Sequence, residues 1–417
     1  MIIYAGKQDN SRTGYVPMVR ELRKVIVPGS GRELLRRELV MAFAGAGFAA
    51  EEADPEALND PCSPSRLEEK LDAPALLFSV NFQGLGDLRR SLDVLARARG
   101  RAAVWFVDNP WNILSGVRDK AWRDLPLFVT DDYFIAPLKA AGATHVFHLP
   151  LACCPELFSP HRARDKAFPA PQGLAPFVFV GRSAFPGRDA FFAGLELPEP
   201  LVRKAGICGE PGDGDEDGAC FSGQRADLGW WEKELGLDSA RFWPGKTARL
   251  PALGAETANL RHRFRCLAAA ARVSVFAGTG LDIFGDRGWE NFLPEGAKLH
   301  PPVDYYARLP GIYAAATFNI CPTSLQLPRG LSQRHFDVWM AGGLALSDAS
   351  PGLSLFPPEL TRPITFNGRR DLEKLAGRLA GGAAREGLIR DWRQCLAGAH
   401  CYRHRIETLL ECLERAR

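Results

Sequence analysis

Four residues between positions 332 and 337 have the types and spacing to bind a phosphorylated ligand. Ser332 is a good helix N-cap, because its hydroxyl can accept a hydrogen bond from an unpaired backbone N–H. Gln333 and Asp337 are four residues apart, and Arg334 and Asp337 three, so they can share one helix face. A helix N-terminus and the planar guanidinium of Arg334 both suit phosphate oxygens, and Asp337 could accept from two vicinal ribose hydroxyls. On spacing alone, an ordinary amphipathic helix with a surface Arg–Asp pair is favoured.

The sequence around these residues predicts the elements that would hold them. It indicates a strand at 318–321, a polar loop at 323–332, a helix at 333–341 and a strand from 344. A glycine pair ends the helix at 342 and 343. The apolar face of the helix has spacings of three and four residues and consists of Phe336, Trp339 and Met340. The loop carries two hydroxyl side chains and a glycine, namely Thr323, Ser324 and Gly330.

The composition limits the class of protein. A length of 417 residues favours two or three domains, and 46% hydrophobic with 24% charged residues is typical of a soluble globular chain. The 52 basic and 49 acidic residues nearly balance, which argues against a nucleic-acid binder with a concentrated basic face. No uncharged apolar run approaches the roughly 20 residues that span a membrane. Residues 1–14 lack the basic start and apolar core of a signal peptide, so we expect a cytoplasmic protein without a transmembrane segment.

The sequence offers little to bind a metal ion. Its ten cysteines include no C-x-x-C pair, and the adjacent Cys153 and Cys154 are poorly spaced for a metal site or an easy disulfide. Eight histidines are scattered along the chain. The acidic stretch 206–223 alternates aspartates like an EF-hand loop, but Gln224 stands where that loop needs a glutamate. We expect reduced cysteines, a flexible acidic loop and no metal.

From residue 75 onward, strands that are apolar throughout alternate with helical segments. Strands are expected at 75–80, 102–107, 127–130 and 146–149, and helices at 85–98 and 134–141. This alternation indicates a parallel sheet covered on both faces, in a Rossmann-like domain without the G-x-G-x-x-G fingerprint. Ligands of such sheets bind beyond the carboxyl ends of the strands, where Asp108 and Asp131 fall. Taken singly, each of these acids is more simply a turn or helix-capping residue.

A proline-rich stretch at 156–176 predicts a linker to a second α/β domain. Strands are expected at 177–180 and 281–284, and each is followed by a glycine turn, Gly181-Arg182 and Gly285-Asp286-Arg287-Gly288-Trp289. A glycine lets the backbone approach a ligand closely. Equally, each turn could be a plain strand-to-helix connection, and Trp289 after the second turn could be an ordinary buried residue. Residues 402–417 predict an amphipathic helix that must dock on another part of the chain.

Several of these stretches resemble one enzyme family. R-x-F-D-x-x-x-A-G-G at 334–343, followed by an apolar strand and Asp348, resembles the nucleotide-sugar site of GT-B glycosyltransferases, most of all the CgeB-type (spore-maturation-protein-like) branch. V-W-F-V-D-N-P-W, T-D-D and H-L-P-L-A-C-C-P-E-L-F resemble the first domain of that branch. Ser332 departs from the pattern, because the branch often has asparagine there. The resemblance implies an α/β, GT-B architecture of two Rossmann-like domains whose parallel sheets face a central cleft.

The resemblance also implies domain boundaries and a function. The acceptor domain would cover residues 1–160 and be completed by a C-terminal helix at 400–417, and the donor domain would cover 176–399. The protein would move a hexose or related sugar from a nucleotide-diphosphate sugar to an acceptor hydroxyl, with no metal or other cofactor. The acceptor would be a surface protein or polysaccharide. A sugar-nucleotide epimerase or hydrolase of the same fold, and a non-catalytic sugar-nucleotide binder in a glycosylation complex, remain alternatives.

Individual residues receive roles from the same resemblance. Asp337 would hold the ribose, and Arg334, Ser332 and nearby backbone N–H groups would stabilise the departing diphosphate. The turn that starts at Gly285 would contact the base. Asp108 or Asp131 would serve as the general base if the enzyme inverts. The expected donor site consists of Gly181, Arg182, Gly285, Asp286, Trp289, Thr323, Ser324, Gly330, Ser332, Gln333, Arg334 and Asp337.

Overall fold

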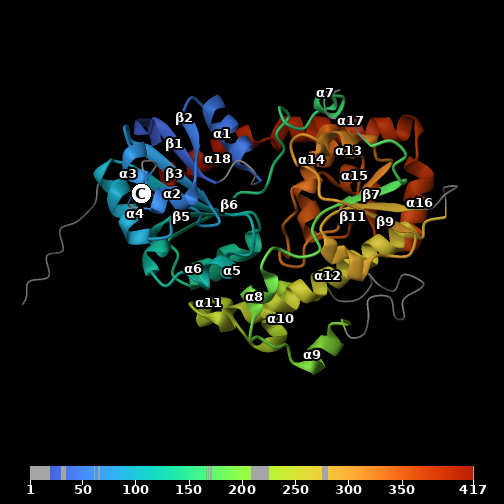
Figure 1. Ribbon diagram of the computed structural model, residues 1–417, viewed down its shortest axis with the longest axis horizontal. Coiled ribbons are helices and arrows are strands. Elements are labelled where there is room, and N and C mark those ends of the chain that lie inside the picture. The colour runs from blue at the N-terminus through green and yellow to red at the C-terminus, as the bar shows by residue number, and fades with distance from the viewer. Residues whose placement is uncertain are drawn as a thin grey trace, which may run out of the picture.

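Two parallel β-sheets with helices packed around them form the two halves of the molecule (Figure 1). The computed structural model describes residues 19–29, 34–60, 62–63, 66–165, 167, 169, 171–207, 225–274 and 280–416. The acidic stretch with the EF-hand-like spacing lies almost entirely outside these residues. Each sheet has six strands in the described part of the chain.

The first sheet has the strand order β2-β1-β3-β4-β5-β6, with every neighbouring pair parallel. Its strands are β1 (Lys24–Pro28), β2 (Ala49–Ala53), β3 (Ala75–Val80), β4 (Arg101–Phe106), β5 (Pro126–Val129) and β6 (His145–His148). Every residue of β3 and β4 is buried, as expected for central strands covered on both faces. The helices of this half are α1 (Arg36–Gly45), α2 (Pro55–Asn59), α3 (Leu67–Lys70), α4 (Leu88–Arg97), α5 (Pro110–Leu114) and α6 (Ile135–Ala140).

The second sheet has the order β12-β11-β10-β7-β8-β9, again with parallel neighbours. Its strands are β7 (Phe177–Val180), β8 (Leu281–Phe284), β9 (Ala297–His300), β10 (Phe318–Ile320), β11 (Ala345–Asp348) and β12 (Thr365–Phe366). Helix α14 (Arg334–Ala341) connects β10 to β11, as the sequence predicted. The remaining helices are α7 (Pro160–Ala163), α8 (Arg188–Phe192), α9 (Glu199–Lys204), α10 (Leu228–Leu235), α11 (Ser239–Phe242), α12 (Leu250–Ala271), α13 (Leu309–Ala315), α15 (Pro358–Thr361), α16 (Arg369–Leu379), α17 (Gly382–Ala399) and α18 (Tyr402–Arg415).

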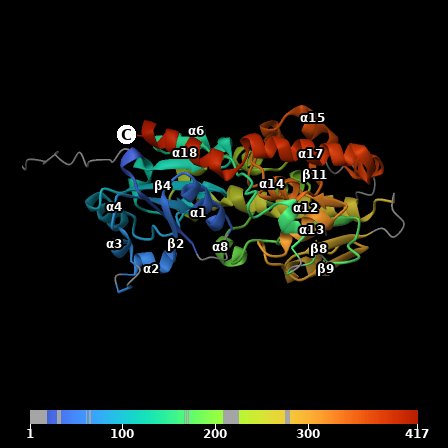
Figure 2. The same ribbon diagram turned by 90° about the horizontal axis from the view of Figure 1, so that it is seen from above.

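The chain crosses between the halves twice. It leaves the first sheet after β6 and reaches β7 through α7, and it returns between α17 and α18, which follow one another along one side of the molecule (Figure 2). Helix α18 packs on α1. The buried Arg101 of β4 donates to the carbonyls of Leu413 (3.1 Å) and Ala416 (2.7 Å). The end of α18 is therefore built into the first half.

Helices α10 to α12, which lie between β7 and β8 in the sequence, bridge the two halves on another side (Figure 1). The Trp243 indole N–H donates to the carbonyl of Leu114 in α5 (2.7 Å), and the ring packs edge-on against Trp122 with centroids 5.3 Å apart. Their apolar residues join one continuous cluster with the first sheet. The two halves are thus held together by a buried apolar interface as well as by the crossings.

Candidate functional site at the facing ends of the two sheets

The start of α14 differs in one detail from the expectation. The helix begins at Arg334 with Gln333 at the N-cap, and no side chain caps it. The expected cap by Ser332 is therefore wrong. The helix starts one residue later than expected, so Ser332 precedes the N-cap. Its hydroxyl lies 3.0 Å from Nδ1 of His335. The other end is as predicted, since Gly342 caps it with a left-handed φ of 91°.

Asp337 and Gln333 share one helix face, as their spacing predicted, and lead a buried hydrogen-bond network. Gln333 Nε2 donates to Asp337 Oδ1 (2.8 Å) and to the carbonyl of Ala152 (2.7 Å), and Gln333 Oε1 accepts from the Tyr402 hydroxyl (2.8 Å). The Tyr305 hydroxyl donates to Asp337 Oδ2. Asp337 is only 1% exposed, and this burial raises the pKa of its carboxyl well above the usual value. The network joins the second sheet to both interdomain crossings.

Arg334 does not pair with Asp337. Its Nη1 donates to the carbonyl of Val180 at the end of β7 (3.0 Å), and its guanidinium lies 5.1 Å from the ring centre of Phe179. The close approach requires Gly181, because a Cβ there would come within 2.8 Å of Arg334 Nη1. The surface Arg–Asp pair is therefore not formed, and Arg334 binds the end of β7 instead.

A second arginine, Arg263 of α12, lies beside Arg334. Its Nη1 donates to the carbonyl of Arg182 (3.2 Å), so the two guanidiniums bind carbonyls on either side of Gly181. Desolvation, the main cause, and the positive charge of Arg334 lower the pKa of Arg263 to about 10. Among the described residues neither arginine forms an ion pair within 4 Å, and the Nε atom of each has no hydrogen-bond partner. The carboxylates of Glu256 and Asp286 act on Arg263 from further away and oppose the fall of its pKa, so the two cations lie together without a direct carboxylate partner.

The turn after β8 braces the turn after β7. Asp286 accepts from the backbone N–H (3.0 Å) and hydroxyl (2.6 Å) of Ser183 and from the N–H of Gly288 (2.9 Å). The Trp289 indole donates to the carbonyl of Gly181 (2.9 Å) and is fully buried. Gly285 is also required, since a Cβ there would lie 2.5 Å from that same carbonyl oxygen. The expected donor residues of the two turns therefore lie together, and the buried Trp289 ring links them through its hydrogen bond to Gly181.

The two candidate bases have different surroundings. Asp131 is buried and accepts from the N–H groups of Arg329 and Gly330 (both 2.8 Å) and of Tyr133 (2.8 Å), so it ties β5 to the loop before α14. Asp108 is exposed at the end of β4 and accepts from the side-chain amide of Asn81 (2.8 Å). Desolvation by surrounding protein raises the pKa of both carboxyls.

Asp108 also faces the second half of the molecule. The negative charge of Glu256, in α12, adds to the rise of the Asp108 pKa and opposes the fall of the Arg263 pKa. Next to Asp108 in the chain, Asn109 donates to Gln326 Oε1 (3.3 Å), and Gln326 Nε2 donates to Glu256 (3.4 Å). Asp108 and Arg263 are thus both within electrostatic range of Glu256.

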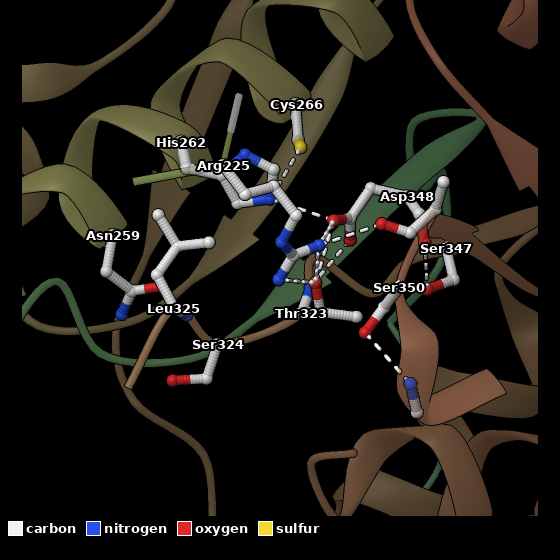
Figure 3. Close-up of polar contacts among 12 residues, drawn as sticks. Arg225, Asn259, His262, Cys266, Thr323, Ser324, Leu325, Ser347, Asp348 and Ser350 are labelled. Carbon is white, nitrogen blue, oxygen red and sulfur yellow. Dashed lines mark hydrogen bonds and ion pairs between the residues drawn. The ribbon is translucent and has the colours of Figure 1, made fainter. Parts of the chain in front are cut away.

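Another polar cluster closes the carboxyl ends of β10 and β11 (Figure 3). Asp348 accepts from the N–H and the hydroxyl of Thr323 (both 2.7 Å) and from Arg225 (3.1 Å), and His262 Nε2 lies 3.0 Å from its Oδ2. Burial opposes ionisation of Asp348, but His262, Arg225 and Thr323 outweigh it and hold its pKa far below the usual value. The Thr323 hydroxyl is thus already engaged, whereas Ser324 stays half-buried and accepts from the N–H of Gln326 (3.3 Å).

A pocket of about 570 Å³ lies between the two halves, beside the loop that precedes α14. Its walls come from the ends of β5 and β6, from the 329–331 loop and from the turn at 351–355. The polar groups along it include Asp132, His148, Arg329 and Ser354. Its size is within the range of small-molecule pockets, roughly 300–1,000 Å³.

Four residues of the site were not predicted from the sequence, namely Arg263, Tyr305, Asn81 and Glu256. Arg263 stands in the run Arg-His-Arg-Phe-Arg at 261–265, and this density of basic side chains was the one local signal available. Among the residues that the structure describes, no group of three or more His, Cys, Asp or Glu side chains could hold a metal ion. In the same residues, no helix combines the length and apolar character needed to cross a membrane.

Comparisons with known proteins agree with this architecture. Residues 261–411 match the model of a family described as Glycosyl transferase-like. A UDP-forming alpha,alpha-trehalose-phosphate synthase from Burkholderia xenovorans has a similar structure at 9% identity, with a TM-score of 0.51 over 95% of this chain and 99% of that chain. A trehalose-6-phosphate structure from E. coli, bound with UDP-2-fluoro glucose, gives 10% identity and a TM-score of 0.50 over 94% and 99%. No curated protein sequence matches the chain. The expected fold is confirmed: the chain has two facing Rossmann-like domains of the GT-B type, and its second half is similar to glycosyl transferases.

Proposed function

We propose that this protein is a glycosyltransferase that moves a sugar from a nucleotide-diphosphate sugar to an acceptor hydroxyl. The observation that carries the proposal is the pair formed by Arg263 and Arg334, two cations side by side without a carboxylate partner at the facing edge of the second sheet. Keeping two like charges together in a partly desolvated place is unfavourable unless a bound anion compensates them. A diphosphate supplies two adjacent negative groups for two guanidiniums.

The same pair suits the chemical step. Cleavage of the glycosidic bond leaves the electron pair and additional negative charge on the diphosphate, so cations fixed beside it bind the transition state better than the ground state. Arg263 and Arg334 are fixed in advance by the carbonyls of Arg182 and Val180. No metal is needed in this scheme, because the guanidiniums and backbone N–H groups balance the charge.

The remaining parts of the cleft receive roles in the proposal. Asp337 would accept from the ribose hydroxyls, which requires Tyr305 to give up its present hydrogen bond to that carboxylate. Asp108 is the exposed carboxylate of the two candidates, and its raised pKa suits a group that takes a proton from an acceptor hydroxyl. Asp131 would instead hold the loop at Gly330 in place.

The comparisons support the substrate class. The structure from E. coli is bound with UDP-2-fluoro glucose, and the enzyme from Burkholderia xenovorans forms UDP. The R-x-F-D-x-x-x-A-G-G segment supports the CgeB-type branch. For the acceptor, we propose a surface protein or polysaccharide. For the location of the enzyme, we propose the cytoplasm.

Binding of nucleoside diphosphates to single variants tests the donor site. Arg263→Ala and Arg334→Ala should each weaken binding of UDP or GDP by calorimetry. Loss of a charge-assisted hydrogen bond costs about 1.5–3 kcal/mol, which corresponds to roughly 10- to 150-fold in Kd. Arg334→Ala should also lower kcat about a hundred-fold or more. Arg265→Ala is the matched control, since this arginine of the same helix binds the carbonyl of Gly206 instead (3.2 Å).

Two results would contradict the proposal. If folded Arg263→Ala and Arg334→Ala bind the diphosphates as the wild type does, the arginine pair is not the donor site. If a donor sugar nucleotide is consumed at full rate without any acceptor, the protein is a hydrolase or epimerase. The uncharged nucleoside should bind all three variants equally, because the arginines are assigned to the phosphates.

A further inference from the structure

Two cysteines meet where the chain crosses between its halves. Cys153 lies on the outgoing crossing between β6 and α7, and Cys401 lies on the return crossing between α17 and α18. The two residues form a parallel bridge. The N–H of Cys153 donates to the carbonyl of His400 (2.9 Å), and the N–H of Tyr402 donates to the carbonyl of Cys153 (3.0 Å). The two crossings are therefore held side by side by their backbones.

The side chains of this pair are placed for a covalent bond. The two Sγ atoms are 3.6 Å apart, and both residues are buried, with 0% and 2% exposure. Paired extended segments lie about 4.8 Å apart, and disulfides join residues whose Cα atoms are roughly 4.4–6.8 Å apart. To form the bond, the sulfur atoms would have to approach each other from 3.6 Å to about 2.05 Å.

The two sulfurs differ in reactivity. Cys401 is the N-cap of α18, in a capping box with His404, and its thiol also donates to the carbonyls of Leu396 (3.4 Å) and Ala397 (3.8 Å). The hydrogen bond from Cys153, helped by the charges of Arg403 and Arg405 against the opposing effect of burial, lowers the pKa of Cys401. The hydrogen bond to Cys401 and burial raise the pKa of Cys153. A cysteine with a lowered pKa, 3.6 Å from a second thiol, has the composition of a reactive cysteine with a resolving partner, and because both residues are buried the oxidant must reach them inside the interface.

We propose that Cys153 and Cys401 are a redox-modifiable pair, which a hydroperoxide oxidises to a disulfide that joins the two interdomain crossings. The Cys401 thiolate attacks one peroxide oxygen, the O–O bond breaks, and hydroxide leaves and takes up a proton. The sulfur of Cys153 then attacks the resulting sulfenic acid, the S–S bond forms, and the sulfenic oxygen leaves as water with the Cys153 proton. Two thiols are oxidised, and one hydrogen peroxide is reduced to two waters.

The disulfide would change both the unfolded and the folded protein. It closes a loop in which the two cysteines are 248 positions apart, and this loop includes the whole second sheet. Closing so long a loop restricts the unfolded chain strongly. In the folded protein, the bond would fix the positions of the two crossings relative to each other. This inference is independent of the proposed sugar transfer.

Oxidation of the full chain tests the pair directly. The protein is treated with hydrogen peroxide, free thiols are alkylated, and peptides are mapped without reduction. We expect a Cys153–Cys401 peptide as the main linked product, together with a rise of several degrees in unfolding temperature that dithiothreitol reverses. Cys153→Ser and Cys401→Ser should each abolish both effects. Cys412→Ser should keep both, because Cys412 is a buried cysteine of α18 outside the pair.

The inference is overturned if this linked peptide is absent after oxidation, or if it forms without a change in unfolding temperature. It also fails if Cys412→Ser removes the effect as completely as the two pair variants do. Should a serine variant fail to fold, the peptide map and the reversal by dithiothreitol in the wild type still decide the question.

Discussion

Two buried aspartates on the same β10–α14–β11 unit should respond in opposite ways to the same substitution. Asp337 is 1% exposed and Asp348 is 2% exposed. Burial raises the pKa of Asp337, because its two hydrogen-bond donors, Tyr305 and Gln333, carry no charge. Burial also opposes ionisation of Asp348, but His262 and Arg225 more than offset it and lower the pKa. Replacement by asparagine removes the charge from both sites and keeps the shape.

At Asp348 the substitution should destabilise the protein strongly. Three donors point at Oδ2, namely the Arg225 guanidinium (3.1 Å), the Thr323 hydroxyl (2.7 Å) and His262 (3.0 Å). In one orientation of Asp348→Asn an amide N–H₂ faces these donors, and in the other it faces the N–H of Thr323. Breaking a buried charged cluster by removing one partner costs about 3–5 kcal/mol. We expect a loss of that size in the free energy of unfolding.

At Asp337 the same change should leave stability unchanged or raise it. The asparagine oxygen can still accept from Gln333, and its N–H₂ can donate to the Tyr305 hydroxyl oxygen, so only the Tyr305 O–H loses its acceptor. The cost of burying an ionised carboxylate is removed as well. If Asp337 holds the ribose, the affinity of Asp337→Asn for the donor should fall. Such a result would mean that the aspartate serves binding and not stability.

Denaturant unfolding at several pH values checks both statements. The depressed pKa of Asp348 contributes stability above its unfolded value, which is lost as the pH falls, so the deficit of Asp348→Asn should shrink below about pH 4. Because the pKa of Asp337 is raised, its ionisation lowers the free energy of unfolding near neutral pH. This loss disappears as the pH falls toward about 4, so any advantage of Asp337→Asn should shrink in that range. Asp391→Asn is the exposed control. Equal losses in both buried variants would refute the reasoning.

Two further expectations concern packing and metals. Gly254→Ala in α12 should destabilise by about 1–3 kcal/mol, because the new Cβ would lie 2.2 Å from the Trp231 ring. Gly398→Ala in α17 meets nothing within 4 Å and should stabilise by about 0.5–1 kcal/mol, and thermal unfolding of both variants separates packing from helix propensity. Sugar transfer should persist in a chelator such as EDTA, since the arginine pair is assigned the role of a cation. Activity that disappears with EDTA and returns with manganese or magnesium would contradict that assignment.

Apolar runs and helical periodicity predicted the central elements of the fold well. β3 and β4 are fully buried and mostly apolar, with Ser79 and Arg101 as the exceptions, so each is visible as a strand signal. The edge strand β2, with the sequence Ala-Ala-Glu-Glu-Ala, was missed because only its last residue is buried. The start of α12, Leu-Pro-Ala-Leu-Gly, gives no helical pattern either.

The site was predictable only where its partners are close in sequence. Gln333 and Asp337 are one helical turn apart, and their hydrogen bond follows from that spacing. Arg334 was expected near Asp337 for the same reason, yet it binds Val180, which is 154 positions away. Tyr305 and Arg263 reach the site through the order of the parallel strands, which local spacing does not specify. Ser332 was misplaced by a single residue at the helix start.

The buried Arg101 sets an order of events during synthesis. Its guanidinium lies in a central strand of the first sheet and donates to the carbonyls of Leu413 and Ala416. Leu413 is 312 positions further along the chain. At roughly 5–20 residues per second, a ribosome needs about 15–60 s to bridge that distance. During this time the first half exposes a charged group and the apolar surface that α18 later covers, while the whole second half is being made and can fold. A nascent chain stalled before residue 402 should therefore bind chaperones through its first half, which is synthesised first.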